Sequence, residues 1–294
     1  MSATAARRLW PVYETYHAVT YFAPESAQAY RDLGLKGGWM GYFASRSAPM
    51  GPVPAGLVTA VFFNFHPSMV ARALPDAWGL ASPEATLTAR LGAVDAALRR
   101  LLPEWAGPDA PRAADTAEAA RLARLAAEAA PLSGRPLYGA LRSQPWPEED
   151  HLVLWHAATL LREHRGDGHV VALTAEGLDG CEAHVTLAAT GKVPRETLQA
   201  NRKWSDEEWE AAEAGLVGRG WLEAVSGASP VLTEEGRAAR QRIEDRTDAL
   251  AAESWRVLGP ERTDRLDELM RPMARAVVER GGVPVPNPVG VSPP

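Results

Sequence analysis

Apolar residues recur at helical spacing along most of the chain, and this pattern predicts an all-α protein with one small β-hairpin. Stretches rich in Pro and Gly at 47–54, 106–111 and 131–147 separate the helices of the first half. We therefore expect residues 1–105 to form a helical N-terminal domain. Residues 106–147 should form a linker that contains one Ala-rich helix.

A nearly continuous apolar segment, 151–164, begins the second half and predicts a buried helix. Gly166 can end that helix in a left-handed turn, and Asp167 can then cap the next helix as its N-cap. The segment 162–169, which reads REHRGDGH, should therefore form a corner between two helices. It holds more functional groups than any other stretch of this length.

The remaining pattern predicts a helix–hairpin–helix order. Ser205 begins a helix with a capping box, Gly220 ends it, and 221–232 reads as two short strands. Thr233 caps a long helix, and a final helix should cover 261–280. We expect 148–280 to be a winged helix-turn-helix domain and the Pro-rich segment 281–294 to be a disordered tail.

Two motifs in this half resemble a known class of regulator. RGWL at 219–222 followed by LTEEGR at 232–237 looks like the corresponding stretch of MarR-type regulators. With REHRGDGH and the WSDEEW at 204–209, the chain also resembles an actinobacterial helix-turn-helix family related to MarR, over about residues 10–280. The abundance of Ala, Arg, Gly and Pro favours the same origin. The resemblance implies a helical N-terminal domain packed on a MarR-like winged helix, but it implies no catalytic residue.

The charge distribution argues against DNA binding. Residues 1–147 contain 14 Lys and Arg against 11 Asp and Glu, whereas 148–294 contain 17 against 26. The helix 205–219, which would enter the major groove in a MarR-like protein, carries five carboxylates and one cation. Groove-reading helices normally present cationic or amide side chains to DNA. The sequence therefore predicts that nucleic acid is not the partner.

The predicted corner supplies candidate site residues. His164 or His169 could act as general acid or base, positioned by Asp167. Three arginines could hold a carboxylate or phosphate, or each could pair with a nearby acid such as Glu163. The early aromatic residues are core residues or line a pocket for an aromatic ligand. The candidate ligand-binding residues are Arg46, Tyr42, Arg162 and Arg165.

Histidines cluster between positions 151 and 184, which contain five of the seven. They could bind zinc, copper or haem iron, or they could be hydrogen-bonded helix-packing residues such as His156 and His184. No His-Glu-x-x-His motif is present, so the metal and the cofactor stay open. Cys181 is the single cysteine and reads as structural.

The single cysteine excludes an intramolecular disulfide framework and favours a reducing cytoplasm. No apolar run approaches the roughly 20 residues of a membrane span. Our main hypothesis is a winged-helix protein that holds a small molecule between its two domains. Its enzyme version is an enzyme of specialised metabolism with a His/Asp/Arg site. The alternative is a ligand-responsive MarR-like transcriptional regulator, usually a homodimer through its terminal helices.

Overall fold

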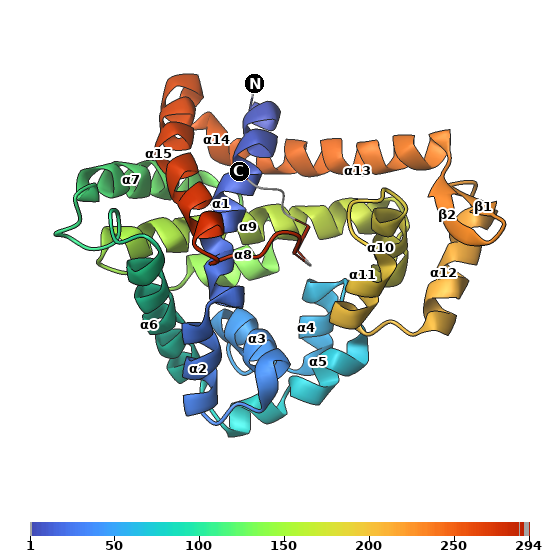
Figure 1. Ribbon diagram of the computed structural model, residues 1–294, viewed down its shortest axis with the longest axis horizontal. Coiled ribbons are helices and arrows are strands. Elements are labelled where there is room, and N and C mark those ends of the chain that lie inside the picture. Colours follow the sequence, from blue (N-terminus) through green and yellow to red (C-terminus); the bar gives the residue numbers. More distant parts are fainter. Residues whose placement is uncertain (1, 288, 291–293) are drawn as a thin grey trace.

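The computed structural model describes residues 2–287, 289, 290 and 294. In this part of the chain the protein is mostly helical with one two-stranded antiparallel sheet, as the sequence predicted (Figure 1). Among the described helices, none has the length and apolar character needed to cross a membrane.

The first 101 residues form six α-helices and two short 3-10 turns. These are α1 (Ser2–Phe22), α2 (Pro24–Asp32), α3 (Gly37–Ser47), η1 (Ala48–Met50), α4 (Ala55–Phe62), α5 (Pro67–Ala73), η2 (Asp76–Gly79) and α6 (Pro83–Leu101). The middle of the chain forms α7 (Ala113–Ala129), α8 (Pro136–Arg142) and α9 (Asp150–Ala175).

The segment that the sequence predicts to be a winged helix, called the winged-helix segment for short, follows α9. It consists of α10 (Gly180–Ala188), α11 (Arg195–Arg202), α12 (Asp206–Gly218), β1 (Leu222–Val225), β2 (Ala228–Leu232) and α13 (Glu234–Ala251). Two further helices, α14 (Glu253–Arg256) and α15 (Gly259–Glu279), lead to the C-terminal segment. The capping box predicted at Ser205 is confirmed, a second one lies at Asp179, and the Thr233 side chain accepts the Gly236 N–H.

Three apolar cores hold these elements together. The first lies among α1, α7, α14, α15, the end of α6 and the first half of α9. The second lies among α2 to α5 and η2, and the third holds the winged-helix segment. Because α1 and α15 share the first core, helices from the two ends of the chain stabilise one another. The division into an N-terminal domain, a linker and a winged-helix domain stays a prediction.

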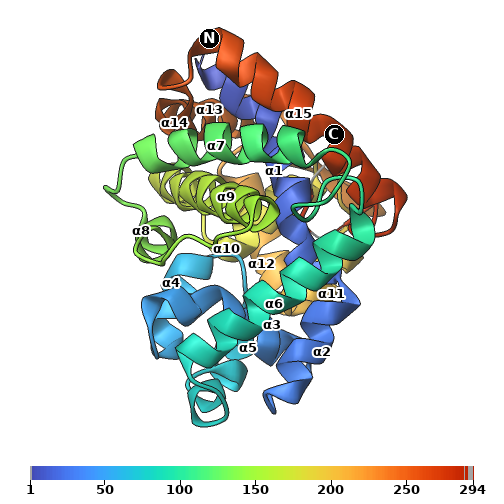
Figure 2. The same ribbon diagram turned by 90° about the vertical axis from the view of Figure 1, so that its left-hand side faces the viewer.

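Helix α9 connects the first core to the third. Leu154 and Leu160 are fully buried in the first core, and Ala172 and Leu173 are buried in the third. Helices α7 and α13 both contact α9, with α7 over its first half and α13 over its second half (Figure 1), and Figure 2 shows the same helices from the side. The REHRGDGH segment lies between the two cores and within one continuous helix.

The predicted corner at Gly166 is therefore wrong. Gly166 does not have the positive φ of a helix-ending glycine, and Asp167 lies inside the helix. Gly168 has a packing role instead, because a Cβ there would lie 3.1 Å from Arg135 Nη2 and 3.4 Å from Leu250 Cβ. Glycine weakens an isolated helix, and α9 contains two, Gly166 and Gly168. Contacts of α9 with α8 and α13 keep it helical at these two residues.

The predicted disorder of 281–294 is corrected for its first residues. Val283 is 2% exposed in the first core, and Asn287 is 4% exposed. Gly282 lies so close to Leu101 and Val277 that a Cβ could not be added without a shift. This segment thus docks on the body through buried contacts, whereas 288 and 291–293 lie outside the described residues.

Candidate ligand site

A cavity of about 260 Å³ lies beside the middle of α9. Residues from α1, α3, α4, α10, α11 and α13 complete its wall. It brings together six of the seven residues that the sequence singled out, and these are Tyr42, Arg46, Arg162, Arg165, Asp167 and His169. The seventh, His164, lies on α9 but does not line the cavity.

Glu163 is the centre of a buried ion-pair network at one side of the cavity. Arg46 Nη2 lies 2.9 Å from each of its carboxylate oxygens, and Arg162 Nη1 lies 2.8 Å from Oε2. Arg46 also donates to the Tyr42 hydroxyl at 2.8 Å, and Arg162 donates to Glu14 at 3.2 Å. In the structure, Arg46 and Arg162 therefore pair with carboxylates of the protein, which is one of the two alternatives that the sequence leaves open.

The network holds Glu163 in its charged form. Burial alone would raise the pKa of this carboxyl group, but Arg162 and Arg46 hold the pKa below its usual value. Glu163 is only 2% exposed, so the two guanidinium groups substitute for water around its charge.

Arg165 lines the same cavity and is held by contacts with α13 and α1. Its Nη2 atom lies 2.8 Å from Asp248 Oδ1 on α13, and its guanidinium group lies 5.4 Å from the centre of the Trp10 ring. Arg7 also reaches Asp248, at 2.8 Å. Arg165 therefore joins α1, α9 and α13 at the cavity wall.

The structure adds two arginines that the sequence reasoning missed, Arg202 and Arg240. Arg202 lies over the Phe65 ring at 4.3 Å, and Arg240 donates to the Thr186 hydroxyl at 2.9 Å. Burial lowers the pKa of both, and Arg46 and Arg162 lower the pKa of Arg202 further. Neither residue stands in a motif, because only the tertiary fold brings α11 and α13 to the cavity.

Asp167 accepts a backbone N–H group at the N-terminus of a helix, as predicted for an N-cap residue. That helix is α8, however, and not one that begins at Asp167. Its Oδ2 atom lies 3.0 Å from the backbone N of Tyr138, in the first turn of α8. Burial raises the pKa of Asp167 to about 7, although this hydrogen bond lowers it. Asp167 makes no hydrogen bond to His164 or His169 among the described residues, so the predicted Asp–His pairing is absent from this arrangement.

The two candidate histidines have separate environments. His164 packs edge-on against Tyr138, with ring centres 5.1 Å apart, and His169 Nδ1 lies 2.9 Å from the Thr247 hydroxyl. Burial lowers the pKa of each to about 4. Both imidazoles therefore favour the neutral form near neutral pH.

His156, His184 and Cys181 are buried packing residues. His184 Nε2 lies 3.1 Å from the Asn64 carbonyl, and His156 packs edge-on against Trp146. No group of three or more His, Cys, Asp or Glu is placed to hold a metal within the described residues. Burial raises the pKa of Cys181 to about 12, which keeps the thiol protonated.

The surface of α12 is acidic, as its sequence indicates. Asp206, Glu207 and Glu210 are exposed, while Glu213 accepts the indole N–H of Trp209. Arg219, at the end of the helix, donates to the carbonyl groups of residues 176 and 177. The exposed face of α12 therefore presents carboxylates to any partner.

Comparisons with known proteins identify the family of the chain. A helix-turn-helix family matches residues 6–284, from α1 through the winged-helix segment to the buried start of the C-terminal segment. No curated protein and no solved structure matches the chain. Since the family match covers nearly the whole length, the chain belongs to this helix-turn-helix family.

Proposed function

We propose that this protein binds a small organic anion with an apolar ring in the cavity beside α9. The observation that carries the proposal is the excess of cationic groups there. Five arginines line the cavity, against the carboxylates of Glu14, Glu163, Glu244 and Asp167. The raised pKa of Asp167 reduces its negative charge near neutral pH. An anion would offset the repulsion that lowers the pKa of Arg202.

The apolar part of the wall favours a ring. The apolar side chains of Val61, Phe62, Phe65, Leu173 and Leu187 line the cavity. A volume of about 260 Å³ falls just below the roughly 300–1,000 Å³ usual for ligand pockets. The ligand should therefore be small, with one ring and one acidic group.

Binding is favoured over catalysis by a histidine base. A general base works best when its pKa lies near the working pH. His169 is the only one of the three proposed catalytic groups that combines an imidazole with a place on the cavity wall, and its pKa of about 4 makes it a weak base. An enzyme of specialised metabolism would therefore have to use Asp167, whose pKa of about 7 lies near that range but whose Oδ2 atom already accepts the Tyr138 N–H.

Calorimetry with benzoate and benzamide tests the proposal, because these probes share a ring but differ in charge. We expect benzoate to bind and benzamide to bind at least about tenfold more weakly. Arg202→Gln should weaken benzoate binding, whereas Arg256→Gln, at an arginine with a 67% exposed side chain, should not. Equal affinity for the two probes, or no effect of Arg202→Gln, would contradict an anion site.

A second candidate is a ligand-responsive, MarR-like transcriptional regulator, favoured by membership of a helix-turn-helix family. The cavity touches α10, α11 and α13, so a ligand could alter the position of the winged helix. The acidic face of α12 argues against duplex binding, because it would meet a polyanion. With this second candidate we also propose an actinobacterial origin, a cytoplasmic location and a homodimer.

A gel shift at low salt with the DNA upstream of the gene separates the two candidates. We expect no specific complex. Sub-micromolar, sequence-selective binding that weakens in Arg219→Gln would favour the regulator instead.

A further inference from the structure

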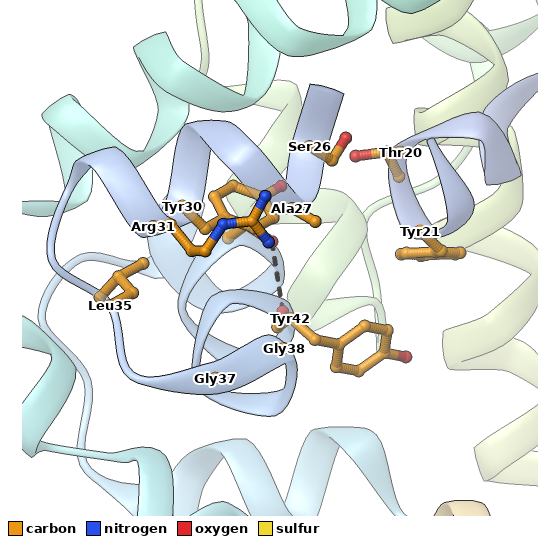
Figure 3. A pocket seen from close by; sticks show the side chains of 11 residues that line it. Thr20, Tyr21, Ser26, Ala27, Tyr30, Arg31, Leu35, Gly37, Gly38 and Tyr42 are labelled. Atoms are coloured by element: carbon orange, nitrogen blue, oxygen red, sulfur yellow. Dashed lines mark hydrogen bonds between the residues drawn. The ribbon is translucent and has the colours of Figure 1, made fainter. Parts of the chain in front are cut away.

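A second cavity, of about 180 Å³, lies between the end of α1 and helices α2 and α3 (Figure 3). Tyr42 lines both cavities, but its hydroxyl is bonded to Arg46 in the first one. The α1–α3 cavity has no part in the function proposed above. It therefore needs its own chemical explanation.

Three buried hydroxyl groups in its wall have no hydrogen-bond partner. They belong to Thr20, Ser26 and Tyr30, which are 3%, 2% and 8% exposed. In Figure 3 the hydroxyls of Thr20 and Ser26 point toward one another. Buried polar groups are nearly always satisfied in folded proteins, so three unpartnered hydroxyls in one cavity wall indicate a polar occupant.

The rest of the wall is apolar or aromatic. The rings of Tyr21, Tyr30 and Tyr42 and the side chain of Leu35 supply most of it. Gly37 and Gly38 leave one part of the wall without side chains, and a Cβ at either position would meet nothing within 4 Å. An occupant can therefore place a ring against this wall.

The wall is almost uncharged. Arg31 is the single ionisable Lys, Arg, Asp or Glu among the described lining residues, and its guanidinium group donates to Gln28 at 2.7 Å. Among the described lining residues no buried cation could hold an acid group, whereas buried arginines line the cavity beside α9. The occupant should therefore be neutral.

We propose that the α1–α3 cavity binds a small uncharged molecule in which an apolar ring carries one or more hydroxyl groups. The ring would lie against the tyrosine faces and Leu35. Its hydroxyl groups would exchange hydrogen bonds with Thr20, Ser26 and Tyr30, each of which can donate and accept. Both parts of the wall are then matched by one ligand.

Phenol and cyclohexanol test this chemistry, with toluene as the probe that lacks a hydroxyl. We expect at least one of the two hydroxylated probes to bind at millimolar concentration in calorimetry, and toluene to bind at least about tenfold more weakly. Binding of phenol alone would identify an aromatic ring, and binding of cyclohexanol alone an aliphatic one. Each of these results supports the shared chemistry.

The double variant Thr20→Val, Ser26→Ala keeps the shape of the wall and removes two of its hydroxyls. It should lose most of the affinity while its melting temperature stays near that of the wild type. Thr88→Val, at an exposed hydroxyl on α6, should bind as the wild type does. Arg202→Gln should also leave this binding unchanged, which separates the site from the cavity beside α9.

Three results would overturn the proposal. They are no binding of either hydroxylated probe, equal binding of toluene, and unchanged affinity in the double variant. A crystal structure grown with the probes that shows only ordered water at the three hydroxyls would overturn it as well.

Discussion

At the scale of single residues, the candidate site depends most on Glu163. The sequence indicated this glutamate only as a counter-ion for the arginines near it. In the structure it accepts hydrogen bonds from Arg46 and Arg162 while almost completely buried. Removing one partner of a buried ion pair leaves uncompensated charge, which costs more than the pair itself contributes.

Glu163→Gln should therefore destabilise the protein by roughly 3–5 kcal/mol. The matched control is Glu118→Gln, because Glu118 pairs with Arg265 on the surface. Solvent screens that pair, so little change is expected there. Urea unfolding of both variants makes the comparison, and equal midpoints would contradict the role given to Glu163.

Asp167 gives a pH-dependent prediction. Because burial raises its pKa to about 7, the native state keeps a proton that the unfolded chain releases from about pH 4 upward. The contribution of Asp167 to stability is thus lost as the pH rises from about 4 to about 7. Each pKa unit of difference corresponds to about 1.4 kcal/mol.

Asp167→Asn should therefore be more stable than the wild type at pH 8, since Asn can still accept the Tyr138 N–H without carrying a charge. The difference should become smaller toward pH 5. Denaturant unfolding at the two pH values measures it. A variant less stable than the wild type at pH 8 would show that Asp167 is needed as an anion.

The sequence identified most of these residues for a partly wrong reason. The REHRGDGH segment predicts a corner because Gly166 and Asp167 locally favour a helix end and a helix start. Contacts with α8 and α13 overrode those preferences, yet the same residues face the cavity because α9 passes between two cores. Arg202 and Arg240 could not be predicted, since no local pattern shows that α11 and α13 lie on the same cavity.

At the scale of elements, the winged-helix segment follows its sequence signals closely. Capping side chains at Ser205 and Thr233 begin the helices that the sequence predicts from them. The glycine of the LTEEGR motif has a packing reason as well. A Cβ on Gly236 would collide with the backbone carbonyl of Trp221, so α13 can approach β1 only with glycine there.

Gly236→Ala should therefore cost roughly 1–3 kcal/mol, as expected for overpacking against backbone. Gly92→Ala is the control, because a Cβ at that helical position would meet nothing within 4 Å. It should stabilise the protein by up to about 1 kcal/mol. Thermal unfolding of both variants decides, and a harmless Gly236→Ala would contradict the close approach of α13 to the hairpin.

At the scale of the whole molecule, the two ends of the chain share one core. Helical periodicity predicted most helices, but it carries no information about which distant helices meet. The contacts of α1 with α13 and α15, and the docking of the C-terminal segment, were therefore outside its reach. Composition alone suggested disorder after residue 280, although one valine in that segment is buried.

Val283→Ala should cost roughly 1–3 kcal/mol, because it removes buried methyl groups from the first core. Val285→Ala, at a residue that is 48% exposed, should change stability by less than about 0.5 kcal/mol. Melting curves of the two variants compare them directly. Indistinguishable curves would support the dispensable tail that composition suggested.

The account as a whole depends on an anion site beside α9. A crystal structure of the protein grown with 4-bromobenzoate locates such a ligand through the anomalous signal of bromine. We expect one strong peak in the cavity, with the bromine near Phe62 and Phe65 and the carboxylate within hydrogen-bond distance of Arg202 or Arg240. An empty cavity at millimolar ligand, or a carboxylate that points away from every arginine, would contradict the proposed function.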